Sequence, residues 1–413
     1  EAIQYLQERR RELGGYVPQR RSSYHQVALP ESSVYEVGKT GSGKQEVAST
    51  MAFARLFKDL LRDKNFGARF VPIIPDEART FGMDAYFPTA KIYNPHGQNY
   101  VSVDRELLLA YKESPQGQIL LPGINEAGAV ASFIAAGTSY ATHQQPMVPV
   151  YVFYSMFGFQ RTGDLMWAAA DAGARGFLIG GIAGRTSIPG EGLQHQDGHS
   201  HLNALAFPNL MAYDPAFAFE IAVIIRDGIK RMYHEKEDIF YYLTVGNDTY
   251  PMPPMPEDSE EGILKGLYRF KKSKLDKGER KAHLLGSGAI MKEVLAAAKI
   301  LEEDYGVATD IWSVTSYKAL YDDAIDTERK NRLQGKAEGD QCHLKAAFED
   351  EEGVVVAATD YVKALPLSVA QWLPEDLTVL GTDGFGRSEG REELREYFEV
   401  DRNHIAYATI LML

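Results

Sequence analysis

The segment Val148-Pro149-Val150-Tyr151-Val152-Phe153-Tyr154 is an unbroken apolar run with no alternating polar positions. Such a run is typical of a strand that is buried on both faces of a sheet. Similar short runs occur at 70–74, Phe177–Gly181 and 239–245, and helical patterns lie between several of them, at 126–136 and 215–233. Strands that alternate with helices in this way predict a parallel α/β sheet.

Local signals predict where two of the helices begin. From Gln45 onward, one apolar stripe recurs at helical spacing. The stripe consists of Phe53, Leu56, Phe57, Leu60 and Leu61. Asp214 is a suitable N-cap for the helix at 215–233, because Pro215 follows it at the first helical position.

The alternation of strands and helices restarts in the last third of the chain. Strands are predicted at 284–286, 311–314, Val354–Ala358 and Leu377–Leu380, and a helix at Met291–Tyr305 that is closed by Gly306. The charged residues 325–350 are predicted to form a loop or an excursion from the domain. The fold class is therefore α/β, with two parallel sheets in two domains.

The domain boundaries follow from composition. Residues 1–44 form an N-terminal arm, 45–250 a first α/β domain and 263–413 a second. Between the domains, residues 251–262 contain four prolines followed by a group of acidic residues, which is typical of a linker. The sequence contains no internal repeat.

Composition excludes several classes of protein. The 413 residues are 45% hydrophobic and 24% charged, as in ordinary globular proteins. A net charge of −13 without a dense basic tract argues against nucleic acid as a partner. The single cysteine, Cys342, predicts a reducing, cytoplasmic compartment. The sequence has no membrane-spanning run and no secretory signal, and because it starts at Glu1 rather than Met we expect it to be part of a longer polypeptide.

Three glycine-rich stretches approach nucleotide-binding motifs without completing one. Residues 38–44 have the spacing of a P-loop, but Gln45 stands where Ser or Thr would bind magnesium, and no apolar strand leads into the motif. A flexible surface turn is the favoured interpretation. The stretches 285–288 and 381–386 are incomplete dinucleotide fingerprints, and we interpret both as tight turns between a strand and a helix.

The densest polar cluster is His195-Gln196-Asp197-Gly198-His199-Ser200-His201. Glycines in and before it predict a loop. Imidazoles presented on a loop suit proton transfer near neutral pH, and this is the favoured role. Structural hydrogen bonding and metal ligation remain alternatives, although the histidine spacing is not a standard one for metal ligands.

Acidic residues occur at two further candidate positions. Asp76 and Glu77 follow the strand at 70–74, at the edge where open α/β sheets bind ligands. The alternative for this pair is a solvated turn. Glu126 stands alone in a segment of small apolar residues, so we expect it to be buried, which is costly without a partner or a shared proton. It either caps a helix or serves a ligand.

Aromatic residues follow the strongest predicted strand, in Tyr154-Ser-Met-Phe157-Gly-Phe-Gln-Arg161. Aromatic side chains at the end of a strand are more often part of the core than a platform for a ligand. Both interpretations are open on this evidence alone.

Six segments together resemble a known family. They are Asp-Glu-Ala-Arg-Thr-Phe-Gly-Met (76–83), Gly-Ile-Asn-Glu (123–126), Tyr-Ser-Met-Phe-Gly-Phe-Gln-Arg (154–161), Gly-Glu-Gly-Leu-Gln-His (190–195), Asp-Gly-His-Ser-His (197–201) and Leu-Gly-Thr-Asp-Gly-Phe-Gly-Arg-Ser (380–388). They resemble the homodimeric dehydrogenase component of the bacterial pyruvate dehydrogenase complex, in the family's order and over most of the chain. The resemblance implies a thiamine diphosphate-dependent enzyme with a transketolase-like fold, of which this chain has the second, pyrimidine-binding domain and the third, carboxyl-terminal domain.

The resemblance also implies residue roles. Glu126 matches the glutamate that bonds the cofactor's pyrimidine nitrogen and promotes loss of the thiazolium proton. Phe157 matches the aromatic residue that packs on the pyrimidine, and Arg161 in the same motif is assigned to cofactor binding. Tyr154 and His195 match residues that contact the substrate-derived part of the intermediate.

The acidic pair matches a position near the cofactor's amino group, with Asp76 assigned to cofactor binding and Glu77 to catalysis. The expected substrate is pyruvate, and the expected partners are a second copy of the chain and the lipoyl-bearing dihydrolipoyl acyltransferase core. Neither nucleic acid nor membrane is expected. A paralogue for another 2-oxo acid and a non-catalytic scaffold are the alternatives.

Two departures from the family pattern stand out. The Gly-Asp-Gly…Asn-Asn motif that holds Mg²⁺ and diphosphate in the family's first domain does not occur in these 413 residues. The Mg²⁺ ligands are therefore expected outside this chain, and no metal ligand is assigned within it. Gln196 stands where the family usually has glutamate.

Overall fold

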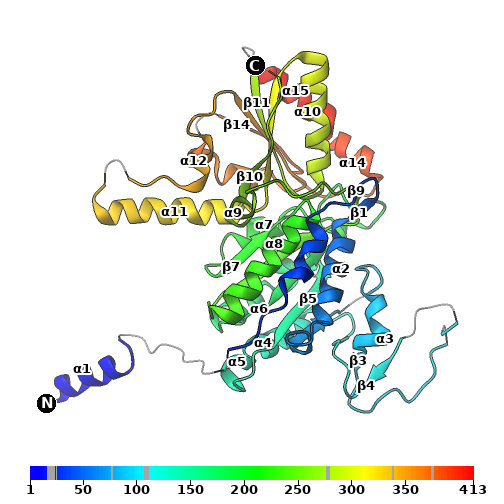
Figure 1. Ribbon diagram of the computed structural model, residues 1–413, viewed down its shortest axis with the longest axis vertical. Helices are drawn as coiled ribbons and strands as arrows, with labels where there is room; N and C mark the ends of the chain where they lie inside the picture. The colour runs from blue at the N-terminus through cyan, green and yellow to red at the C-terminus, as the bar shows by residue number, and fades with distance from the viewer. Residues whose placement is uncertain are drawn as a thin grey trace.

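The chain folds into two five-stranded sheets that lie one above the other along the long axis of the molecule (Figure 1). The computed structural model describes residues 1–15, 24, 26–75, 78–103, 105–106, 111–275, 280–336, 339–373 and 376–413. The α/β fold class with two largely parallel sheets is confirmed. We propose the ranges 45–250 and 263–413, which hold one five-stranded sheet each, as the two domains, with 251–262 as the linker.

The first sheet is parallel throughout. Its strand order is β2 (Phe70–Ile73), β5 (Val148–Tyr154), β6 (Phe177–Gly181), β8 (Phe240–Val245) and β7 (Leu210–Tyr213). Alternate residues of β5 enter different cores: Val150 and Val152 face one, whereas Tyr151 and Phe153 face the other. The apolar run at β5 is therefore buried on both faces, as its sequence predicts.

Helices cover both faces of this sheet. The helices α2 (Ser49–Leu61) and α8 (Ala218–Ile229) pack on one face, and α4 (Glu126–Gly137) and α6 (Phe159–Asp171) on the other. Shorter elements of this half are α3 (Phe87–Ala90), β3 (Ile92–Tyr93), β4 (Glu113–Ser114), α5 (Ser139–Thr142) and α7 (Ser200–Ala204).

The second sheet has one antiparallel edge strand, β10, and is otherwise parallel. Its order is β10 (Leu267–Lys271), β12 (Ala308–Val314), β11 (Lys281–Gly286), β13 (Val354–Ala358) and β14 (Leu377–Leu380). Its helices are α9 (Glu260–Lys265), α10 (Met291–Tyr305), α11 (Tyr317–Gln334), α12 (His343–Phe348), α13 (Ala364–Leu367), α14 (Arg391–Tyr397) and α15 (Arg402–Met412).

Three local predictions are wrong. The helix expected from Gln45 begins only at Ser49, because Glu46–Ala48 forms strand β1 and pairs with β9 (Thr249–Pro251). The helix expected from Pro215 begins at Ala218. Its cap is the carboxylate of Glu220, which accepts hydrogen bonds from the amides of Ala216 (2.6 Å) and Phe217 (3.0 Å), so Asp214 is not the N-cap.

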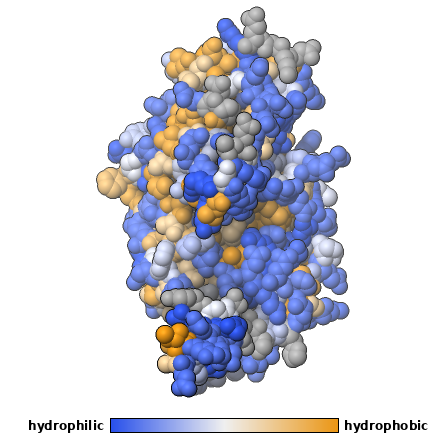
Figure 2. All heavy atoms as spheres, turned by 90° about the vertical axis from the view of Figure 1, so that its left-hand side faces the viewer, coloured by the Kyte–Doolittle hydropathy of each residue, from blue (hydrophilic) through white to orange (hydrophobic). Residues whose placement is uncertain are grey.

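The third prediction, a loop or an excursion at 325–350, is wrong as to the loop, whereas the projecting helix α11 fits the excursion. This range contains most of α11 and all of α12. Helix α11 projects from the domain (Figure 1), and the face that carries it is mostly hydrophilic (Figure 2). Its charged residues are therefore the solvated surface of a helix rather than a loop.

The arm contains a helix, α1 (Ala2–Glu12), none of whose residues is buried. Residues 38–45 form a turn. Within it, the amide of Ser42 donates a hydrogen bond to the carbonyl of Met252 over 2.8 Å. A 3₁₀ helix precedes this turn and β1 follows it, so the strand and helix of a P-loop are absent from this described part of the chain. In the portion of the chain that the structure describes, no helix is both long and apolar enough to cross a membrane.

Candidate active site

The candidate site lies where β5 ends and turns into α6. Tyr154 closes the strand, the 3₁₀ helix Ser155–Phe157 follows, and α6 starts at Phe159. A side chain at Gly158 would collide with the ring of Phe153, so this sharp turn needs a glycine. The turn holds Phe157 beside Tyr154 at the carboxyl edge of the parallel sheet, where open α/β sheets bind ligands.

Four rings gather at this edge. The His195 ring centroid lies 4.9 Å from that of Tyr154 and 5.2 Å from that of Phe157, and Phe81 packs on Tyr154 at 5.3 Å. His195 comes from a 3₁₀ helix, Leu193–His195, so residues far apart in sequence converge here. Its buried Nδ1 has no hydrogen-bond partner among the described residues, and the Glu191 carboxylate is 3.7 Å away. A buried, unpartnered ring nitrogen is an exception that a bound ligand would explain.

Glu126 joins this group through Arg161. The guanidinium Nη1 lies 2.8 Å from Oε1 of Glu126, and its Cζ lies 3.8 Å from the centroid of the Phe157 ring. Glu126 is the first residue of α4, where helix amides favour negative charge, but the cap is Asn125, whose side chain accepts from the Gly128 amide. Its side chain is 13% exposed, so the expected apolar burial is incomplete and the carboxylate has a charged partner.

Tyr151 is a neighbour that sequence reasoning missed. Its hydroxyl is buried and has no hydrogen-bond partner within the described ranges. Burial raises its pKa far above the ordinary value, and the nearby negative charge of Glu126 adds to the rise, so the hydroxyl stays neutral. No sequence signal marks it, because a tyrosine within an apolar strand looks like core.

The three histidines of the polar cluster have separate environments. His195 faces the aromatic group, and half-buried His199 has its Nε2 3.1 Å from Oε1 of Gln160. His201 is buried, with Nε2 2.8 Å from Thr244 Oγ1, and burial lowers its pKa to about 4, against the opposing effect of Asp197. Structural bonding is thus the outcome for His201, and only His195 lies in the candidate site.

Asp76 and Glu77 lie outside the described residues, so their predicted roles stay predictions. They follow Pro75 at the carboxyl end of β2, next to β5 in the sheet. Among the described residues, the structure therefore brings together Glu126, Tyr154, Phe157, Arg161 and His195.

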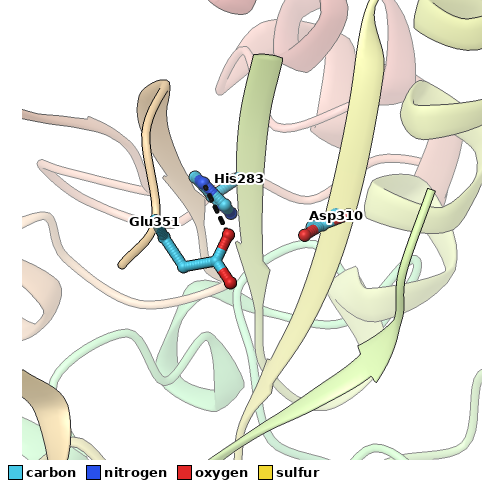
Figure 3. Close-up of side chains that lie close together, drawn as sticks. All are labelled: His283, Asp310 and Glu351. Carbon is cyan, nitrogen blue, oxygen red and sulfur yellow. Dashed lines mark ion pairs between the residues drawn. The ribbon is translucent and has the colours of Figure 1, made fainter. Parts of the chain in front are cut away.

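A second polar group, His283, Asp310 and Glu351, lies in the other sheet (Figure 3). Both nitrogens of His283 are engaged: Trp312 Nε1 lies 3.2 Å from Nδ1, and the Glu352 carbonyl lies 3.1 Å from Nε2. Burial and the charge of Lys281 lower the pKa of His283, so the ring is neutral. Lys281 and Arg269 bridge both carboxylates, which accounts for this group as an ion-pair network rather than a metal site.

Asp214 connects the hydrogen bond of His201 and Thr244 to a residue of the second domain. Thr244 Oγ1 donates to Asp214 Oδ1 over 2.6 Å, and the hydroxyl of Tyr361, from the second domain, lies 3.4 Å from the same oxygen. Burial raises the pKa of Asp214 to about 7, although hydrogen bonds from Thr244 and Ser287 favour the charged form. A carboxyl group at the domain junction therefore titrates near neutral pH.

We expect this carboxyl group to make stability fall with rising pH. Between its unfolded pKa of 3.8 and about 7, folded Asp214 keeps a proton that the unfolded chain releases, so its contribution is complete below pH 4 and lost above 7. Asp214→Asn removes this loss, which is on the order of 4 kcal/mol. Denaturant unfolding from pH 4 to 8 should show the free energy of unfolding of Asp214→Asn rising relative to that of wild type. The control Asp326→Asn, on the exposed surface of α11, should follow the pH dependence of wild type. A difference in unfolding free energy between Asp214→Asn and wild type that does not change with pH would contradict the raised pKa of Asp214.

Comparison with solved structures defines the class of protein. Transketolase from Campylobacter jejuni superposes with a TM-score of 0.66 at 16% identity, over 91% of this chain and 49% of that one. A split-gene transketolase, described as an inactive β4 tetramer, superposes with a TM-score of 0.59 at 15% identity, over 89% of this chain and 99% of that one. The fold is thus transketolase-like.

The family follows from sequence. Residues 30–253 match the middle domain of the pyruvate dehydrogenase E1 component, and residues 266–401 match the transketolase-like C-terminal domain. The chain is 51% identical over 407 residues to the pyruvate dehydrogenase E1 component of Pseudomonas aeruginosa, 53% over 411 to that of Mycolicibacterium smegmatis and 48% over 410 to that of Escherichia coli K12. It belongs to the pyruvate dehydrogenase E1 component family. These matches cover 98–99% of this chain but only 44–46% of the relatives, so the chain spans about half their length.

Proposed function

We propose that this chain supplies the pyrimidine-binding half of a thiamine diphosphate-dependent enzyme that decarboxylates pyruvate and passes the acetyl unit to a lipoyl group. The observation that carries the proposal is the convergence of Glu126, Phe157, Tyr154 and His195 at one sheet edge. The relatives named as pyruvate dehydrogenase E1 components support the choice of substrate.

The residues present fit the pyrimidine end of the cofactor. Phe157 offers a ring on which a flat heterocycle can stack, and Glu126 a carboxylate at the edge of the same group. The unpartnered Nδ1 of His195 supplies a hydrogen-bonding atom beside them. The Mg²⁺ and diphosphate ligands must come from outside this sequence, which lacks the Gly-Asp-Gly…Asn-Asn motif pair.

When bound, thiamine diphosphate supplies a carbon nucleophile for the ketone of pyruvate and an electron sink for the loss of carbon dioxide. Phe157 would hold the pyrimidine ring, and Glu126 would exchange a proton with its nitrogen to prepare that nucleophile. His195 moves protons on the substrate side, and Tyr154 orients His195 by edge-on packing at 4.9 Å. Asp76 and Glu77 would act near the amino group of the pyrimidine.

The proposal includes partners and location. We propose a homodimer, because the transketolase-type architecture places the cofactor between subunits, and the lipoyl-bearing acyltransferase core as the partner that takes the acetyl unit. A cytoplasmic location is proposed from the single, unpaired and buried Cys342. A longer 2-oxo acid is the rival substrate, since one methylene changes selectivity only modestly.

The test is His195→Ala. The test uses the full-length protein, meaning a polypeptide that joins this chain to a diphosphate-binding domain. We expect the affinity of the variant for thiamine diphosphate to stay within a few-fold of wild type, because His195 lies on the substrate side. Turnover of pyruvate should fall by about 10²-fold or more, the usual scale for a proton-transfer group.

His199→Ala is the matched control, because His199 is a histidine of the same loop, half-buried like His195, that contacts Gln160 instead of the aromatic group. Steady-state kinetics and calorimetric titration of both variants separate turnover from binding. Intact turnover with lost cofactor affinity in His195→Ala would move this residue to the cofactor-binding set.

A further inference from the structure

One guanidinium engages both groups that the proposed function assigns to the pyrimidine ring. Arg161 lies over the face of Phe157, with Cζ 3.8 Å from the ring centroid, and pairs with Glu126 over 2.8 Å. An aminopyrimidine has the same two requirements, because it is flat, stacks on an aromatic face and, when its ring nitrogen is protonated, donates a hydrogen bond to a carboxylate. The guanidinium is likewise planar, stacks on aromatic rings and presents N–H donors in its plane.

The environment explains why Glu126 pairs with a cation. Its side chain is 13% exposed and lies near the neutral, buried hydroxyl of Tyr151. A largely buried carboxylate without a partner is costly, and a paired guanidinium offsets that cost. The Arg161 side chain is 47% exposed, so it can return to water without crossing a packed core.

The backbone offers a place for the movement. Thr162, directly after Arg161, has non-helical dihedral angles (φ −130°, ψ 23°) that separate the first turn of α6 from the rest of the helix. The next residue, Gly163, has open space around the position of a Cβ atom. The turn that carries Arg161 is therefore not locked to the helix body by a continuous run of helical backbone.

We propose that Arg161 holds the place of the pyrimidine ring in the cofactor-free protein and leaves Phe157 and Glu126 when the cofactor binds. This inference rests on the proposed function and adds a step to it. In its present position Arg161 competes with the cofactor for Phe157 and Glu126 and is not a direct ligand of the cofactor. The apparent affinity for the cofactor is then reduced by the fraction of molecules in which Arg161 has moved away.

The experiment compares Arg161→Met, Arg161→Lys and wild type in the full-length protein. Calorimetric titration with thiamine diphosphate at fixed Mg²⁺ measures affinity without reference to activity. If Arg161 lies on the Phe157 ring in about nine-tenths of the molecules, Arg161→Met should bind thiamine diphosphate about tenfold more tightly than wild type. Arg161→Lys should lie between the two, because lysine keeps the charge but not the planar stack. Arg332→Met, on exposed α11, controls for the loss of one positive charge.

Thermal unfolding supplies the second readout. Without cofactor, Arg161→Met should melt below wild type, because Glu126 has lost its partner, and saturating cofactor should close the gap. Weaker binding by Arg161→Met, or a gap that widens with cofactor, would make Arg161 a direct ligand and overturn the proposal. Unchanged affinity would overturn it as well, with the proposed function intact. If no variant, wild type included, binds thiamine diphosphate, the proposed function fails and the inference falls with it.

Discussion

Glu126→Gln is expected to keep the fold and to slow proton exchange at the thiazolium carbon of bound thiamine diphosphate by about two orders of magnitude or more. Glutamine preserves the size of the side chain but cannot exchange a proton with the pyrimidine nitrogen. The carboxylate lies at the first turn of α4, 13% exposed and within an ion pair of Arg161, so the amide should be accommodated without repacking of the core.

The measurement is hydrogen–deuterium exchange of the thiazolium proton, followed by quenching and NMR, on the full-length protein. Glu261→Gln, at an exposed position of α9, makes the same chemical change away from the site and should exchange at the wild-type rate. Unchanged exchange in Glu126→Gln would remove Glu126 from cofactor activation and leave the Arg161 pair as its only role. Slow exchange together with altered unfolding would instead point to a structural defect.

Sequence patterns predict best the strands that are apolar along their whole length, and they also find β14, which is only partly buried. The runs at β5, β6 and β13 are apolar throughout, and their bounds were predictable to the residue. Strands β7 and β10, at sheet edges, were missed, as were the short strands β1, β3, β4 and β9. Strand β10 has a mixed sequence, Leu267–Lys271, whose last three residues are not fully buried.

Helix α11 was missed for a different reason. Apolar contacts hold only its beginning, through Tyr317, Leu320 and Ala324, and the remainder projects into solvent. Its usable sequence signals are the two ends: the Ser316 side chain caps the first turn, and Gly335 ends the helix in a left-handed conformation (φ 62°). A pattern search for an apolar stripe cannot find such a helix, whereas its capping residues can.

The candidate site was predictable only in part from isolated residues. The resemblance of the segments around Glu126, Phe157 and His195 to one family pointed to a common site, and the geometry now brings these residues together. Asp214 was predicted as a helix cap. Its actual environment depends on Tyr361 and Ser287 from the second domain, and such long-range burial leaves no local sequence pattern.

The 413-residue chain purified alone is expected to release no carbon dioxide from pyruvate. In the proposed function, thiamine diphosphate is held at both ends, and the residues of this chain would bind only its pyrimidine. The diphosphate end accepts charge-assisted hydrogen bonds, which are about twice as strong as neutral ones. Without two or three of these hydrogen bonds, at about 1.5–3 kcal/mol each, binding should weaken by about 10²-fold or more.

The decisive comparison sets this chain against a polypeptide extended upstream to include a domain with the Gly-Asp-Gly…Asn-Asn motif. Calorimetric titration and a decarboxylation assay should show tight binding and turnover for the extended polypeptide, and only with Mg²⁺. The chain alone should still unfold cooperatively, because each of its sheets has helices on both faces and does not need the cofactor for its core. Tight, Mg²⁺-dependent binding by the chain alone would place a diphosphate site within these residues. In that case its ligands would have to be sought at the same sheet edge as Glu126, and the division of the cofactor between two parts of the enzyme would be wrong.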